Sequence, residues 1–212
     1  QQGIDDPSIG QREILVQFAD SLVEFHLTCE GQVRRGRRHL QIGHSRGNRS
    51  HLQRGGTAEV DRPDLWRRLL ELFASGQLER AVLVAGLVVT LQPPATPELE
   101  RVAWTVLAHA QFDLGRFVDA ETSYVRLQSY ALAPEQRKEV TGRVAASIYR
   151  QAESAQASGD IDAAVANFLR IAVAAPDADI RPTALFDAAT LLLTNQRWNE
   201  SVGLLQRFRR EF

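Results

Sequence analysis

Apolar residues between Ile148 and Pro176 recur three and four positions apart in two runs. A polar turn, Ser158-Gly159-Asp160, separates the runs. This spacing places the apolar side chains of each run on one face of a helix. Gly159 suits the left-handed conformation that ends a helix before the chain reverses, and Pro176 prevents the second helix from continuing. The pattern therefore predicts two amphipathic helices joined by a tight turn.

The same pattern occurs four times along the chain. The turns are centred on Gly76, Gly115, Gly159 and Gln196. Five residues after each turn stands a small residue, in order Ala81, Ala120, Ala164 and Ser201. Nine and twelve residues after the turns stand Ala85, Tyr124, Phe168 and Leu205, and then Val88, Leu127, Ile171 and Phe208. Eleven residues before the turns stand Leu65, Trp104, Ile148 and Leu185, and seven before them Leu69, Ala108, Ala152 and Ala189. An unrelated up-and-down bundle would also show apolar periodicity, but it would not require a small residue at the same offset after every turn.

These columns resemble the tetratricopeptide repeat (TPR) family, whose helix–turn–helix unit repeats about every 34 residues. The resemblance covers residues 63–212, although the turns lie 39, 44 and 37 residues apart. The first-helix tryptophan of the family is present only as Trp104, and the last copy has Gln196 in place of its turn glycine. Irregular spacing of this kind resembles bacterial TPR proteins of cell-envelope assemblies, which favours a periplasmic or envelope-associated location.

The expected fold is all-α, a TPR-like solenoid of about four helical hairpins. We expect the repeats at 63–93, 97–132, 134–176 and 180–212, with the first helix of the third copy running from about 134 to 158. Residues 1–29 predict an N-terminal helix, since apolar residues form one stripe over 8–28. Residues 30–62 are rich in arginine and glycine and keep no period, which predicts an irregular or disordered linker.

The composition excludes few classes of protein. The chain is 44% hydrophobic and 24% charged with a formal net charge of −1, as in ordinary globular proteins. No run reaches the roughly 18 apolar residues of a membrane span. Cys29 is the only cysteine, so no intramolecular disulfide forms. The missing initiator methionine and the abrupt end at Phe212 fit a processed or excised fragment.

No catalytic, cofactor or metal site is predicted. Residues 43–47 match the G-x-S-x-G motif of hydrolases, but neither a buried strand nor a helix flanks Ser45, as that nucleophile requires. Four possible metal ligands match no zinc pattern in their spacing: Cys29, His39, His44 and His51. We therefore expect a protein that is not an enzyme.

The resemblance implies that first helices line a concave, apolar and aromatic groove that binds a peptide or helix of a partner protein. The implied groove residues are Trp66, Leu70, Phe73, Thr105, His109, Phe112, Tyr149, Glu153, Gln156, Phe186, Thr190 and Leu193. Each of the aromatic residues could instead pack against a neighbouring repeat. The lysine and asparagine clamp for acidic tails, known in some TPR proteins, is absent.

Two other kinds of association remain open. Residues 34–54 carry arginines that could bind an anion or nucleic acid, but no aromatic residue between Phe25 and Trp66 offers a platform for base stacking. If further repeats follow in the parent protein, exposure of Phe208 and Phe212 would favour self-association of this chain.

Overall fold

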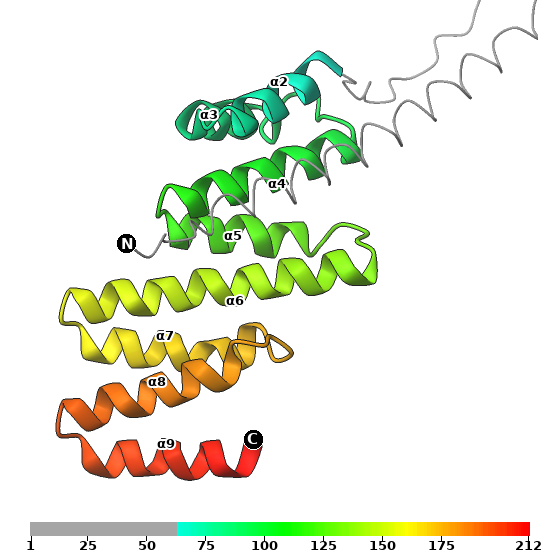
Figure 1. Cartoon of the computed structure of the whole chain (residues 1–212). Helices are drawn as coiled ribbons and strands as arrows, with labels where there is room; N and C mark the ends of the chain where they lie inside the picture. The colour runs from blue at the N-terminus through cyan, green and yellow to red at the C-terminus, as the bar shows by residue number, and fades with distance from the viewer. Residues whose placement is uncertain (1–62) are drawn as a thin grey trace, which may run out of the picture. The chain divides into compact units, whose positions relative to one another are not determined.

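The computed structural model describes residues 63–212, and within this range the chain is all-α, as the sequence predicts. The eight helices of this range are α2 (Pro63–Ala74), α3 (Leu78–Val88), α4 (Pro97–Asp113), α5 (Phe117–Leu127), α6 (Pro134–Ala157), α7 (Ile161–Ala174), α8 (Arg181–Thr194) and α9 (Trp198–Glu211). Each helix packs on the one before it, and α2 also packs on α4. The helices are stacked in chain order from α2 to α9, in one compact unit (Figure 1).

The packing is consistent with helical hairpins, in which α2 pairs with α3, α4 with α5, α6 with α7 and α8 with α9. The turns inside the last three pairs lie on one side of the stack, and the connections between these pairs lie on the other (Figure 1). Helix α6 has 24 residues, which accounts for the wide spacing between the second and third turns. Residues 1–62, with the predicted N-terminal helix and the arginine-rich linker, lie outside the described range.

All four turns adopt a left-handed backbone at the residue that the repeat predicts. The φ angles are 71° at Gly76, 75° at Gly115, 82° at Gly159 and 60° at Gln196. In every turn this residue donates its amide to a carbonyl three residues earlier, and the next residue donates to a carbonyl five residues earlier, over 2.8–3.1 Å. This pair of bonds is the Schellman motif, which satisfies carbonyls at a helix end.

The small residue after each turn lets the two helices of a pair approach closely. Ala81, Ala120, Ala164 and Ser201 are all fully buried. A small side chain at this point permits the short interaxial distance of packed helices. In the last pair, Ser201 Oγ donates to the carbonyl of Ala189 on α8 over 2.8 Å, so this hydroxyl is satisfied in its buried position.

The one turn without glycine offers a test of stability. Gln196 holds φ at 60°, a conformation that costs a residue with a Cβ roughly 1–2 kcal/mol. Glycine avoids that cost but loses more entropy on folding, so we expect Gln196→Gly to raise the free energy of unfolding by about 0.5–1 kcal/mol. Urea denaturation followed by circular dichroism measures the change.

Gly159→Ala is the matched control. No heavy atom lies within 4 Å of a Cβ built at Gly159, so only the backbone conformation resists the substitution. We expect this variant to lose about 1 kcal/mol. Equal stability of all three proteins would mean that the left-handed turns relax without penalty.

Candidate partner-binding groove

An open groove of about 270 Å³ lies between α6 and α8, the first helices of the last two pairs. We call it the α6–α8 groove and define it by its lining residues, Tyr149, Glu153, Gln156, Phe168, Asp187, Thr190, Leu191 and Thr194. On α6 the lining positions are spaced by four and three residues, and on α8 by three, one and three. Such spacing presents one face of each helix, so the two helix faces form the opposite walls.

A hydrogen bond joins the two walls. The hydroxyl of Tyr149 on α6 donates to Oδ2 of Asp187 on α8. Burial of Tyr149 and this hydrogen bond raise the pKa of the phenol to about 12, so the hydroxyl keeps its proton at neutral pH. The bond uses only one carboxylate oxygen of Asp187, and within the described chain no hydrogen bond reaches Oδ1.

Phe168 of α7 packs below this bond. It is 2% exposed, and its ring lies 5.1 Å from the ring of Tyr149 at an interplanar angle of 66°. An edge-to-face pair of this kind favours a fixed orientation of both rings. The base of the groove is therefore apolar and held in place, while its rim carries hydroxyl, amide and carboxylate groups.

The groove is acidic. Glu153 and Asp187 line it, and its lining contains neither lysine nor arginine. Glu153 forms an ion pair with Arg150, one turn away on the same helix, over 2.8 Å, but both side chains are about half exposed and solvent screens the pair. A ligand with hydrogen-bond donors or positive charge matches this surface better than an acidic one does.

The structure brings four of the twelve predicted groove residues together in this groove. They are Tyr149, Glu153 and Gln156 of the third pair and Thr190 of the fourth. Phe186 and Leu193, the other two predicted residues on α8, are 49% and 42% exposed but do not line it. Phe186 instead lies beside Phe208 of α9, with ring centroids 5.9 Å apart.

The remaining predicted residues lie in the first two pairs, and Phe73 and His109 are buried there. Their rings are 6.3 Å apart, and the ring of His109 lies 5.3 Å from that of Tyr124, so all three belong to the packing of α2, α4 and α5. Phe112 is partly buried against Phe117 at 5.3 Å. Trp66, Leu70 and Thr105 are half-buried. Phe73 and His109 thus pack between the helices of these two pairs, while the other four predicted residues there keep part of their surface exposed.

Four lining residues were not predicted from the sequence: Phe168, Asp187, Leu191 and Thr194. Asp187 directly follows the predicted Phe186, so α8 presents a face rotated by about one residue from the expected one. One signal was present in the sequence. Tyr149 and Asp187 are 38 residues apart, close to the 37 residues that separate the third and fourth turns, which places them at nearly equivalent positions.

Several sequence candidates lie outside the described residues: the segment Gly43–Gly47, the residues Cys29, His39, His44 and His51, and the arginines of 34–54. Within residues 63–212, no group of three or more histidine, cysteine, aspartate or glutamate side chains could hold a metal ion. A search of the same residues finds no helix with the length and apolar character of a transmembrane segment.

The described part of the chain is thus all-helical, with eight helices packed in chain order and an acidic groove between α6 and α8. Comparisons of the chain with protein-family models, with curated proteins and with solved structures find no match.

Proposed function

We propose that the hairpins form a TPR-like solenoid that acts as a non-catalytic scaffold, and that the α6–α8 groove binds an extended segment of a partner protein. The observation that carries this proposal is the gathering of Tyr149, Glu153, Gln156 and Thr190 around one groove. These residues come from two pairs and were selected by their offsets from the turns. The four left-handed turns and the buried small residues support the assignment to TPR-like repeats.

The groove suits a peptide with a basic side chain. Its volume of about 270 Å³ is near the lower end of ligand pockets, roughly 300–1,000 Å³, so it fits one or two side chains rather than a whole helix. A lysine or arginine above Asp187 would reach Oδ1, the oxygen that Tyr149 does not use. Backbone amides and carbonyls of the peptide would pair with Gln156, Thr190 and Thr194 on the rim.

A peptide-display selection on the full chain tests the proposal. We expect the selected peptides to be extended and to share a basic residue. Thr190→Arg places a long cation in the groove and should weaken their binding by roughly ten-fold or more, since a like charge then faces the basic residue.

Thr122→Arg is the matched control, because Thr122 is an exposed threonine of α5 that does not line the groove. It should leave the affinity unchanged. Equal losses in the two variants, or selected peptides without a basic residue, would contradict this use of the groove.

The arginine-rich segment 34–54 remains the alternative, as an anion or nucleic-acid binder, and it lies outside the described residues. Salt separates the two functions. Binding of single-stranded nucleic acid through several arginines should weaken steeply between 50 and 200 mM salt, by orders of magnitude. Binding of a peptide with one basic residue should weaken only modestly. The bacterial envelope setting likewise rests on the family resemblance alone.

A further inference from the structure

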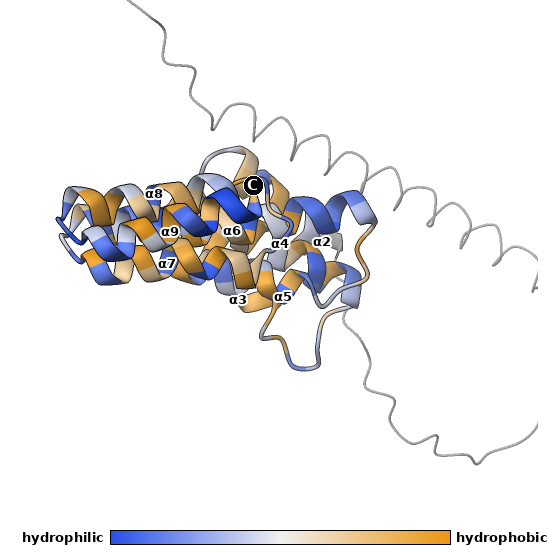
Figure 2. Ribbon diagram, turned by 90° about the horizontal axis from the view of Figure 1, so that it is seen from below, coloured by the Kyte–Doolittle hydropathy of each residue, from blue (hydrophilic) through white to orange (hydrophobic). Residues whose placement is uncertain are grey.

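Helix α9 carries an apolar face that no other described helix covers. Trp198 and Val202 are 57% and 50% exposed, and Leu205 continues the same stripe at 36%. The spacing of four and three residues keeps these three side chains on one side of the helix. We call this set the α9 outer face. Figure 2 views the stack from the α9 end, where hydrophobic and hydrophilic residues are interleaved along this helix.

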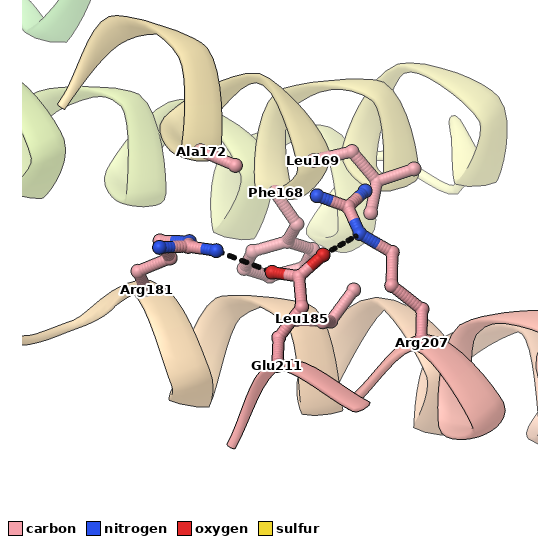
Figure 3. A pocket seen from close by; sticks show the side chains of 7 residues that line it. All are labelled: Phe168, Leu169, Ala172, Arg181, Leu185, Arg207 and Glu211. Atoms are coloured by element: carbon pink, nitrogen blue, oxygen red, sulfur yellow. Dashed lines mark hydrogen bonds and ion pairs between the residues drawn. The ribbon is translucent and has the colours of Figure 1, made fainter. Parts of the chain in front are cut away.

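The other side of α9 is fixed to the stack. Figure 3 shows Glu211 of α9 between Arg181 of α8 and Arg207 of α9. Glu211 accepts hydrogen bonds from both, and these bonds lower the pKa of its carboxyl, the contribution of Arg207 being the larger. Because this network and the pairing with α8 hold the helix, the outer face is presented in a fixed orientation.

The earlier pairs show what lies against the equivalent face. The residues equivalent to Leu205, nine after the turns, are Ala85, Tyr124 and Phe168, and all are buried. The second helices α3, α5 and α7 are each packed against by the first helix of the next pair, namely α4, α6 and α8.

Direct bonds across one of these interfaces identify further equivalent positions. Six residues after its turn, Glu121 of α5 accepts a hydrogen bond from Gln151 of α6 over 2.7 Å. Thirteen after it, Gln128 donates to Thr141 of α6 over 3.3 Å. The equivalent residues of α9 are Val202 and Arg209, and both are exposed. The α9 outer face therefore corresponds to the side of α3, α5 and α7 on which the next first helix packs, most directly at the position of Leu205, which is buried in all three earlier pairs.

Helices α4, α6 and α8, which cover α3, α5 and α7, share a short sequence pattern that α2 lacks. A small buried residue is followed by a large apolar one and, four residues later, by alanine. The pattern reads Ala103-Trp104 with Ala108 in α4, Ser147-Ile148 with Ala152 in α6, and Ala184-Leu185 with Ala189 in α8. In α2 the same positions are Asp64, Leu65 and Leu69. An aspartate in place of the small residue would be desolvated against Val202 and Leu205, which disfavours α2 of a second copy as the occupant.

Charge specifies the occupant further. Arg209 and the adjacent Arg210 are exposed, and neither forms an ion pair within the described chain. Gln128, the residue of α5 equivalent to Arg209, bonds to Thr141 of α6. Thr141 lies six residues before Ser147, the small residue that begins the pattern in α6. In a bound helix, an acidic residue about one to two turns before the small residue would therefore meet Arg209.

We propose that the α9 outer face binds an amphipathic helix of a partner protein, with acidic residues followed by the sequence small, large apolar, any three, alanine. This interface is separate from the α6–α8 groove and does not depend on it. Partner binding there would bury Leu205, as the internal interfaces bury its equivalents, and would cover Trp198 and Val202 beside it.

The test uses a fluorescein-labelled peptide of residues 96–114, which carries Glu98 and Glu100 ahead of Ala103-Trp104 and Ala108. Fluorescence anisotropy with the full chain should show saturable binding. Leu205→Glu should weaken it by roughly ten-fold or more, since a charge replaces a buried leucine in the interface. Leu83→Glu on α3 is the matched control, because Leu83 is 67% exposed and lies outside this face, and it should leave binding unchanged. Circular dichroism checks that both variants fold.

A charge exchange gives an independent readout. Arg209→Glu should weaken binding of the peptide several-fold, and a peptide with Glu98→Lys and Glu100→Lys should bind this variant better than it binds the unaltered chain. Absence of binding, or equal binding to the Leu205→Glu variant, would overturn the proposal. So would a dimer in sedimentation that Leu205→Glu dissociates while the peptide fails to bind, because the occupant would then be a second copy.

Discussion

Phe168→Ala is expected to lower the free energy of unfolding by about 3–5 kcal/mol, the usual cost of removing a buried aromatic ring. Phe168 is 2% exposed, packs against Tyr149 and stands nine residues after its turn, where the third pair meets the fourth. Its removal leaves a cavity below the bond between Tyr149 and Asp187. Urea denaturation followed by circular dichroism measures the loss.

Leu205→Ala is the matched control for this substitution. Leu205 occupies the same position in the last pair but is 36% exposed, so truncation there should cost about 1 kcal/mol or less. Phe168→Leu, which keeps most of the buried volume, should recover most of the stability. A loss at Leu205 as large as that at Phe168 would mean that α9 is covered in solution, for example by a second copy.

The second large effect concerns pH. Burial between α2, α4 and α5 lowers the pKa of His109 from 6.5 to about 4, with Arg143 of α6 lowering it further and the hydrogen bond between Nδ1 and the carbonyl of Thr105 opposing the shift. Folded His109 therefore stays neutral while unfolded His109 takes up a proton. The free energy of unfolding should fall as the pH drops from 6.5 towards 4, by about 3 kcal/mol in all. Above pH 6.5 this contribution is fully present.

His109→Phe isolates the effect, because phenylalanine fits among aromatic neighbours and does not titrate. Denaturation of both proteins at several pH values between 7 and 4 gives the difference in slope. The acidic residues and the other histidines contribute equally to the pH dependence of both proteins, so their contributions cancel in the difference. Parallel curves would show that His109 is protonated in the folded chain or remains buried after unfolding.

Much of the fold was predictable because the repeat has a local chemical basis. A left-handed turn favours Gly76, Gly115 and Gly159, and a close helix crossing needs a small residue such as Ala164. Both requirements act within one hairpin, so one copy of the sequence pattern shows which residue types they need, and the next copy shows whether the same types recur. Gln196 shows that the position of the turn is set by the whole pattern, since its backbone is left-handed without glycine.

The groove was predictable only in part, because periodicity does not distinguish an apolar face that meets solvent from one that meets another helix. His109 and Tyr149 both precede their turns on first helices, yet α2 and α5 enclose His109 whereas Tyr149 borders an open groove. On α8, Asp187 lines the groove whereas Phe186 lies beside Phe208 of α9, a difference that periodicity alone does not indicate.

Packing of each helix on its neighbours in sequence has a consequence for how such a chain can change over time. Its Schellman turns and its column of small residues are complete within each hairpin. Duplication or loss of a whole hairpin would therefore join surfaces that already fit one another, as the faces of α3, α5 and α7 show. A lineage carrying this architecture can lengthen or shorten its stack of helices by whole hairpins and leave the remaining hairpins as they were.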